Sequence, residues 1–506
     1  MLVDVFLNAA AILYVVSAVF LTIFVSSFGV LLVIYYFTKH KHPVRPEVSD
    51  DELLSITIQL PIYNESHVID RLIDACVGLD YPREKLFIQV LDDSTDETTE
   101  VVQAKISEWE AKGFKNITLV RRPNRKGYKA GALAYAMQYT QTDCVAVFDA
   151  DFVPPTDFLR RTMPYFSRDP KLALIQTRWE HLNLDYNWLT RAQALNIDGH
   201  FAIEQVARSR GRLPMSMNGT GGIWRIQAIN DAGGWSSSTL TEDLDLSYRA
   251  LMKGWDFLYL VDVAVPGELP PQVQAYKMQQ ARWATGSTEC LIKHAVPLMK
   301  SKRFSLPKKF MGLMHLSQYV VQPIILLVFL LTPILLVGDM FDKLPDLRII
   351  GAFGIIPPLL IALAQLELHR NWRDALIYFP VQFVVGAAVV LSNSKAVLNA
   401  FHRPGVEREF KRTPKFRITR QGQKWSGSRY VLKVDMITLG ELGLAVYAFL
   451  GFILALIKVP AISPYMLIYS IAFVLFAFWN IYQVRELNRQ QAEAETAASA
   501  IASAAD

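Results

Sequence analysis

The chain is poor in cysteine and lacks a strong excess of charge of either sign. Cys76, Cys144 and Cys290 are its only cysteines, and they stand far apart with no shared motif. They form neither a disulfide framework nor a zinc site, and they suit a reducing compartment. The formal net charge is +5, and the basic residues gather beside apolar segments. This distribution is typical of the cytoplasmic face of a membrane protein and argues against nucleic-acid binding.

Formal charge is also absent from the N-terminal segment between Asp4 and Lys39. A spanning helix needs about 20 apolar residues, so one tilted transmembrane helix is predicted within residues 1–42. A signal peptide would instead begin with basic residues and end in a cleavage site of small residues. Here the basic cluster 39–42 follows the apolar run. The positive-inside rule then places the N-terminus outside and the next domain, residues 43–300, in the cytoplasm.

More apolar segments follow, which agrees with a hydrophobic content of 52%, and they predict a helical membrane domain over residues 301–489. The segments are Leu316–Val337, Ile350–Leu366, Leu376–Phe401, Ile437–Ile457 and Tyr465–Tyr482. If all of them crossed the bilayer, the basic stretch 402–433 would lie outside, against the positive-inside rule. We therefore interpret the polar segment 376–401 as an interfacial or re-entrant helix, which leaves five spans in the whole chain. Residues 490–506 are expected to form a flexible tail.

Between the membrane segments, short β-branched runs alternate with helical patterns. This alternation predicts βαβ units and a mostly parallel sheet. The strand that ends at Leu91 runs directly into Asp92-Asp93, and the strand that ends at Phe148 runs into Asp149-Ala-Asp151. Open α/β sheets bind ligands at the carboxyl ends of their strands. The predicted fold class is therefore an α/β domain with a ligand site, inserted between α-helical transmembrane segments.

Asp149 and Asp151 are candidate ligands for a divalent cation, Mg²⁺ or Mn²⁺. If the ligand is a sugar-nucleotide diphosphate, its negative charge must be neutralised as the diphosphate leaves. An ion held by one or two carboxylates and by phosphate oxygens does this. Lys129, at the start of a predicted helix, can place a further cation and helix N–H groups near the same phosphates. A lone Asp-x-Asp after a strand is more often a turn or a helix cap. The functional interpretation therefore depends on the motifs that follow.

Two later motifs supply the remaining chemical groups. In Thr241-Glu-Asp243, Asp243 is the candidate base, because an acceptor hydroxyl is a weak nucleophile and needs a carboxylate to take its proton. The same residues fit a helix N-terminus, and both interpretations can hold. In Gln279-x-x-Arg282-Trp283, the arginine can pair with a diphosphate and the tryptophan offers a flat face to a sugar ring. Alone, this motif would indicate an amphipathic helix.

Taken in order, these motifs resemble those of the family 2 glycosyltransferases, and specifically the processive, membrane-integrated polysaccharide synthases. Cellulose synthase is one of these, and the sequences of the motifs are most similar to those of the plant cellulose-synthase-like mannan synthases. The resemblance covers nearly the whole chain. It implies a GT-A-like fold and inverting transfer of a hexose from UDP-glucose or GDP-mannose to a growing β-glycan. The resembling stretches are Pro61-Ile-Tyr63-Asn64-Glu65, Asp92-Asp93-Ser94, Lys129-Ala-Gly131, Asp149-Ala-Asp151, Gln176-Thr-Arg-Trp179, Asn218-Gly-Thr-Gly-Gly-Ile-Trp-Arg225, Thr241-Glu-Asp243-Leu-Asp245 and Gln279 to Gly286.

The resemblance also implies roles for individual residues. Donor binding is implied for Tyr63, Glu65, Asp93, Lys129, Asp149, Gln279 and Arg282. Acceptor binding is implied for Gly219, Thr220, Glu242 and Trp283, with Asp243 as the base and Asp149 and Asp151 as the metal ligands. Phe410, Thr413 and Lys415 resemble the gating loop of cellulose synthase, with Arg412 where a valine is usual. A basic patch that attracts anionic lipid is the alternative for this loop.

Three functions stay open at this point. The first is processive synthesis with export, in which Glu441, a costly carboxylate in a predicted span, would line the polymer path. The second is transfer of one sugar to a membrane lipid, and the third is transport without catalysis. The several C-terminal spans and the gating-like loop favour the first. No cyclic-di-GMP-binding domain is expected after the last span, and the expected location is a bacterial inner or plasma membrane.

Overall fold

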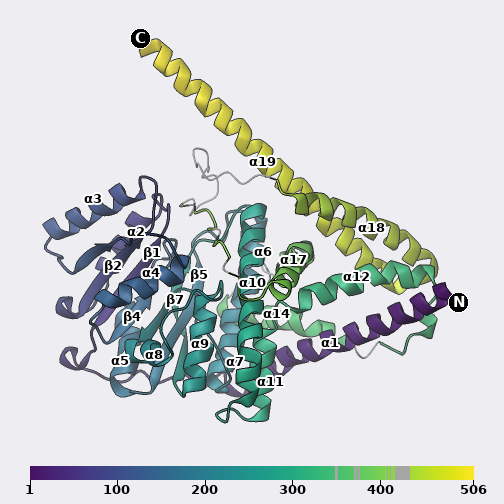
Figure 1. Cartoon of the computed structure of the whole chain (residues 1–506), viewed down its shortest axis with the longest axis horizontal. Coiled ribbons are helices and arrows are strands. Elements are labelled where there is room, and N and C mark those ends of the chain that lie inside the picture. The colour runs from purple at the N-terminus through teal and green to yellow at the C-terminus, as the bar shows by residue number, and fades with distance from the viewer. Residues whose placement is uncertain are drawn as a thin grey trace.

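The computed structural model describes residues 1–347, 351–369, 373, 377–406, 408–410, 412–415, 417 and 434–505. The predicted segment ends at Ile350 and Leu376, residues 418–433 of the predicted gating-like loop, and Asp506 lie outside the described residues. A sheet domain and a bundle of long apolar helices lie side by side in the described part (Figure 1).

The sheet has seven strands and is mostly parallel. Its strands are β1 (Ile56–Ile62), β2 (Leu86–Asp92), β3 (Ile117–Val120), β4 (Cys144–Val147), β5 (Leu172–His181), β6 (Gly222–Arg225) and β7 (Asp256–Gly267). Their order across the sheet is β3-β2-β1-β4-β6-β5-β7, and β6 alone runs antiparallel to its neighbours. Strands β1 and β4 are buried along nearly their whole length, as expected of strands covered by helices on both faces. This sheet confirms the predicted fold class.

Helices cover both faces of the sheet. One face packs against α2 (Ile69–Val77), α3 (Thr98–Ala111) and α5 (Phe158–Arg168). The other packs against α4 (Tyr128–Ala136), α8 (Ile226–Asp231) and α9 (Glu242–Lys253). Because β1, β2 and β4 are parallel, the loops that follow them meet at one edge. The side chains that come directly after these strands are therefore brought together there.

A long helix, α10 (Val273–Lys300), stands between the sheet domain and the apolar helices (Figure 1). On one side it packs against α9, where Gly286 lies under Thr241. On the other side Ala284 packs against Ala396 and Val397 of α17 (Val390–His402). The motif residues Gln279 to Gly286 therefore lie on a helix that packs against both the sheet domain and the apolar helices.

The apolar helices agree with a membrane protein but differ in detail from the predicted spans. Among the described residues, three helices are long and apolar enough to cross a bilayer: α1 (Leu2–Thr38), α18 (Met436–Lys458) and the first part of α19 (Ser463–Ala505). Two bent pairs bring the number to five if each is one span. The bend is 68° between α11 (Leu306–Leu316) and α12 (Val321–Val337), and 41° between α16 (Phe379–Ala388) and α17. The second pair is the segment predicted to be interfacial or re-entrant.

One predicted span is short in the structure. Within the predicted segment from Ile350 to Leu366, α14 (Ile356–Leu368) forms a short apolar helix together with the turn before it. Leu360 and Ala364 of this helix pack against Phe201 and Ile203, in the π-helical turn between α6 (Trp188–Gly199) and α7 (Gln205–Arg210). Its apolar residues are thus partly used against the sheet domain. Helix α19 continues to Ala505 and includes most of the segment expected to be a flexible tail.

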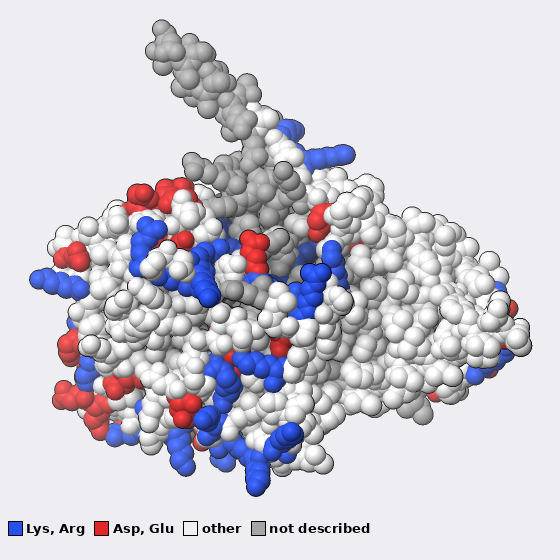
Figure 2. All heavy atoms as spheres, viewed as in Figure 1, with Lys and Arg blue, Asp and Glu red and all other residues white. Residues whose placement is uncertain are grey.

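Charged side chains are unevenly distributed between the sheet domain and the apolar helices. Figure 2 shows Lys, Arg, Asp and Glu scattered over the sheet domain, whereas the part formed by α1 and α12 is nearly free of them except at its far tip. An uncharged surface of this extent suits contact with lipid. On the face that Figure 2 shows, α1 and α12 are therefore suited to a bilayer.

The contact between Gly286 and Thr241 yields a testable prediction. A Cβ added at Gly286 would lie 2.8 Å from the backbone nitrogen of Thr241, so Gly286→Ala should push α9 and α10 apart and cost about 1–3 kcal/mol of folding free energy. The matched control is Gly443→Ala in α18, where an added Cβ meets no atom within 4 Å. Thermal unfolding in detergent measures both. A melting temperature for Gly286→Ala equal to that of Gly443→Ala would contradict the prediction.

Candidate active site

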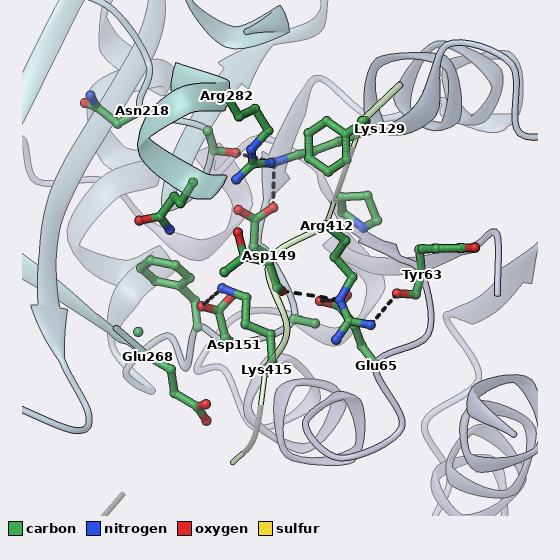
Figure 3. A pocket seen from close by; sticks show the side chains of 18 of the residues that line it. Tyr63, Glu65, Lys129, Asp149, Asp151, Asn218, Glu268, Arg282, Arg412 and Lys415 are labelled. Atoms are coloured by element: carbon green, nitrogen blue, oxygen red, sulfur yellow. Dashed lines mark hydrogen bonds and ion pairs between the residues drawn. The ribbon is translucent and has the colours of Figure 1, made fainter. Parts of the chain in front are cut away.

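A pocket at the carboxyl ends of β1, β2 and β4 holds almost every residue that the sequence assigned to a site. The start of α9, the part of α10 from Gln279 to Trp283, and Phe410 with the segment 412–415 form its other sides (Figure 3). Thr220 is the exception, because it is fully buried behind the pocket, where its Oγ1 accepts a hydrogen bond from the backbone N–H of Asp149 at 3.0 Å. The predicted residues that line the pocket are Tyr63, Glu65, Asp93, Lys129, Asp149, Asp151, Gly219, Glu242, Asp243, Gln279, Arg282, Trp283, Phe410, Thr413 and Lys415.

Lys129 joins the carboxylates from two sides of the pocket. Its Nζ lies 2.5 Å from Oδ1 of Asp149 after β4 and 3.7 Å from Oε1 of Glu242 at the start of α9. It also donates to the backbone oxygen of Gly219 at 2.9 Å. Burial opposes its charge, but Asp149 and Glu242 outweigh burial and hold the pKa of Lys129 above its usual value. The group is therefore a fixed cation next to the carboxylates, as a diphosphate site requires.

Asp149 and Asp151 fit the role of metal ligands. Asp151 is buried, and among the described residues its Oδ1 has no hydrogen-bond partner. A buried carboxylate oxygen of this kind needs a proton donor or a cation. Its Oδ2 pairs with Lys415. Within the part of the chain that the structure describes, no group of three or more His, Cys, Asp or Glu is placed to hold a metal. The remaining ligands of an ion would therefore come from phosphate oxygens or water, as is usual for Mg²⁺.

Asp243, the predicted base, lies in the pocket with a raised pKa. It lies in the first turn of α9. An ideal Cβ on Gly219 would lie 3.6 Å from Oδ2 of Asp243, and Gly219 adopts a positive φ of 82°. A side chain at this glycine would therefore be strained and would narrow the space in front of the carboxylate. Burial, and then the negative charge of Glu242, raise the pKa of Asp243 to about 7. A carboxylate with this pKa accepts a proton near neutral pH.

The Gln279-x-x-Arg282-Trp283 motif presents a cation and an aromatic face to the pocket. The guanidinium carbon of Arg282 lies 4.3 Å from the ring centre of Phe410, in a cation–π contact. Burial lowers the pKa of Arg282, against the opposing effect of Asp149. The ring of Trp283 lies 6.5 Å from that of Trp179, which packs in turn on Phe152. These rings form an apolar wall in the pocket that Asp243 also lines.

A second cluster lies around Tyr63, next to β2. The guanidinium of Arg125 stacks 3.4 Å from the centre of the Tyr63 ring. Arg412 donates to the backbone oxygen of Tyr63 at 2.9 Å and lies 3.5 Å from Glu65 (Figure 3). Burial raises the pKa of Glu65 to about 7, although Arg412 opposes the shift. This end of the pocket combines aromatic, cationic and acceptor groups, which suits a planar base.

The two aspartates of Asp92-Asp93 separate in the structure. Asp93 lines the pocket and accepts hydrogen bonds of 2.7 and 2.5 Å from Arg122, which pairs with it through two nitrogens. Asp92 is buried and accepts from the N–H of Ser94 and the hydroxyl of Thr99. The first carboxylate therefore fixes the loop after β2, and only the second faces the site.

Several residues of the site were missed by sequence analysis. Arg122 and Arg125 belong to a basic run between β3 and α4, which was a usable signal. Glu268 lines the pocket and pairs with Arg71 at 2.7 Å; burial raises its pKa. Trp179 was noted only within a resembling stretch. No pattern marks Glu268, because its place in the pocket follows from the pairing of β5 with β7.

Comparison with known proteins agrees with this geometry. The family described as "Glycosyltransferase like family 2" matches residues 55–286. Glucomannan 4-beta-mannosyltransferase 1 of Oryza sativa subsp. japonica is 35% identical over 416 residues, which cover 80% of this chain and 78% of the relative. Glucomannan 4-beta-mannosyltransferase 9 of Arabidopsis thaliana is 46% identical over 267 residues, which cover 52% of this chain and 50% of the relative. The chain thus spans about half the length of several such relatives.

A solved structure shares the fold. It is a mannosyltransferase from Pyrobaculum calidifontis in complex with GDP-Man and Mn²⁺, and it is 21% identical to this chain. The TM-score is 0.50, and the match covers 78% of this chain and 99% of that one. This likeness confirms the predicted GT-A-like fold.

The geometry of Asp151 predicts the effect of its loss on metal binding. Asp151→Asn should weaken Mn²⁺ binding in the presence of a nucleoside diphosphate by at least about 10-fold, because even changes to residues around a metal ligand cost this much affinity. Electron paramagnetic resonance of free Mn²⁺ measures the affinity. The matched control is Asp51→Asn, since Asp51 is exposed and outside the pocket. Equal affinities in the two variants would remove Asp151 from the metal site.

Proposed function

The chain belongs to glycosyltransferase family 2, and we propose that it transfers mannose from GDP-mannose to a growing β-linked mannan or glucomannan at a membrane surface. The observation that carries the proposal is that Lys129, which pairs with Asp149, lines the same pocket as Asp243, whose pKa is raised to about 7. The names of the plant relatives support mannose as the donor sugar and a β-mannan as the product.

Asp243 is the proposed base. It takes the proton of the acceptor hydroxyl while the oxygen of that hydroxyl forms a bond to the anomeric carbon of mannose. The bond from that carbon to the diphosphate oxygen breaks, and GDP leaves with the electron pair. Because the attack comes from the face opposite the leaving group, an α-linked donor gives a β-linkage. The pKa of about 7 matches the task, since the carboxylate must be charged before transfer and protonated after it.

Cations around the diphosphate are proposed to stabilise the leaving group. Lys129 is fixed by Asp149 and Glu242, and Arg282 reaches the pocket from α10. Such charges act strongly in a pocket that excludes water. A divalent cation held by Asp149 and Asp151 would neutralise further charge on the departing diphosphate. The Mn²⁺ in the mannosyltransferase with the same fold supports this assignment.

The place of Trp283 supports elongation of a polymer. Its ring lies on the helix that stands between the sheet and the apolar helices (Figure 1). An acceptor stacked on Trp283 would have its growing end at Asp243 and its other end towards the membrane helices. We propose on this basis that the enzyme is processive and that its product leaves through the membrane. The basic clusters 39–42 and 302–309 support a cytoplasmic active site and an N-terminus outside.

The segment 412–415 is proposed to close the pocket over the donor. It follows the apolar helix α17, and its Lys415 and Arg412 pair with Asp151 and Glu65 inside the pocket. An incoming diphosphate and metal would draw Asp151 away from Lys415 and offer the ammonium a phosphate instead. Residues on a segment of this kind act as a lid that sequesters the reaction from water.

The donor and the product can be tested directly. We expect purified protein in lipid vesicles to incorporate radiolabelled mannose from GDP-mannose into a polymer that β-mannanase degrades, with little incorporation from UDP-glucose. Linkage analysis and gel filtration identify the product. Transfer only from UDP-glucose would contradict the assignment of the donor. Label found only in a lipid that carries a single sugar would favour the non-processive alternative.

The pH dependence of turnover tests the base. Because Asp243 acts only when deprotonated, kcat should fall about 10-fold per pH unit below its pKa of about 7. Asp243→Asn should lower kcat by about 10² or more at every pH and change GDP-mannose binding little. Glu65 has a similar pKa, so Glu65→Gln is the control and should keep the acidic limb. An unchanged acidic limb in Asp243→Asn would assign the proton transfer to another group.

A further inference from the structure

A buried ion pair joins the helix of the active site to a membrane span. Nζ of Lys277 in α10 lies 2.5 Å from Oε2 of Glu441 in α18. The two side chains are only 3% and 0% exposed. Lys277 comes two residues before Gln279 of the motif. Sequence analysis suggested that Glu441 would line a polymer path, whereas the structure gives its carboxylate a partner on the active-site helix.

Further hydrogen bonds surround this pair. The side-chain amide of Gln274 donates to Asp435, the N-cap of α18, at 3.2 Å. It also accepts from Asn480 of α19 at 3.2 Å. The backbone N–H of Val273 donates to Gln483 of α19 at 3.0 Å. The first turns of α10 are therefore hydrogen-bonded to two apolar helices, α18 and α19. This helix is thus not only a surface helix of the sheet domain.

The pair constrains α10 more strongly than apolar packing would. Apolar contacts are nondirectional and allow a helix to slide or turn by small amounts. A buried ammonium and carboxylate must stay in hydrogen-bond contact, because separating them leaves an uncompensated charge away from water. The position and rotation of α10 at Lys277 are thus set by α18.

The fixed position of α10 matters more for Trp283 than for Arg282. Arg282 has a long side chain, which can reach the diphosphate from slightly different helix positions. Trp283 has a rigid ring with two torsions, so its face moves with the helix. Its ring is also backed by Trp179 of the sheet domain. A small shift of α10 therefore changes the angle of the Trp283 face more than it changes the reach of the guanidinium.

We propose that Lys277 and Glu441 are positioning residues, which hold the Trp283 face at the angle that a glycan acceptor requires. Elongation then depends on a contact with a membrane span, whereas cleavage of the donor by water does not. The inference rests on the proposed function, in which Trp283 binds the acceptor.

The test replaces both charges together. In Lys277→Met/Glu441→Leu no charge is left unpaired, and such replacements often preserve stability. We expect a melting temperature close to that of the wild type. We also expect the ratio of mannose incorporated into polymer to GDP-mannose hydrolysed to fall about 10-fold or more, because small misplacements of reacting groups cost rates of this size. The charge-swapped variant Lys277→Glu/Glu441→Lys should recover most of the ratio.

The control is Lys458→Met, which removes an ion pair of the same helix α18, with Asp339 at 2.7 Å, far from α10. It should leave the ratio unchanged. Equal losses of elongation and hydrolysis in the double variant, or the same change of ratio in Lys458→Met, would overturn the positioning role. A double variant that unfolds while the charge swap keeps the wild-type ratio would support it. A wild-type protein that makes no polymer in the same assay would instead overturn the proposed function.

Discussion

Repulsion among carboxylates is the constraint on which the rest of the structure depends. Asp149, Asp151, Glu242 and Asp243 line one pocket, and charges of one sign at short range cannot all persist in a site that excludes water. Cations from separate elements offset this negative charge. They are Lys129 at the start of α4, Arg282 in α10 and Lys415 after α17. Burial, and then the charge of Glu242, raise the pKa of Asp243 to about 7, and that leaves it able to exchange a proton near neutral pH.

Helix α10 contacts both the sheet domain and the apolar helices. It packs on α9, which carries Asp243, through Gly286, and on α17 through Ala284. Its first turns bond to α18 and α19. The motif thus lies on a helix that is held from both sides, and not on a loop of the sheet domain.

The strands and the residues at their ends were predictable because they depend on local sequence. The runs before Asp92 and Asp149 are short, apolar and β-branched, and the carboxylates come directly after them. The partners of these side chains were not predictable, because Arg122 and Lys415 reach Asp93 and Asp151 only after the chain has folded. The packing of α14 was not predictable either. Local hydropathy marked this segment as apolar, but only the folded chain places part of its surface against the turn at Phe201. Thr220 faces away from the pocket, since the positive φ of Gly219 and Gly221 turns the loop between them.

The segment 412–415 has a consequence for the order in which the site is completed. It follows the apolar helix α17 and reaches back to residues near β1 and β4, more than two hundred positions earlier in the chain. A nascent sheet domain emerges from the ribosome before this segment exists. Until the segment has been synthesised, the domain therefore lacks Arg412 and Lys415, and its pocket is open on one side. Completion of the pocket thus waits for α17 and the residues that follow it.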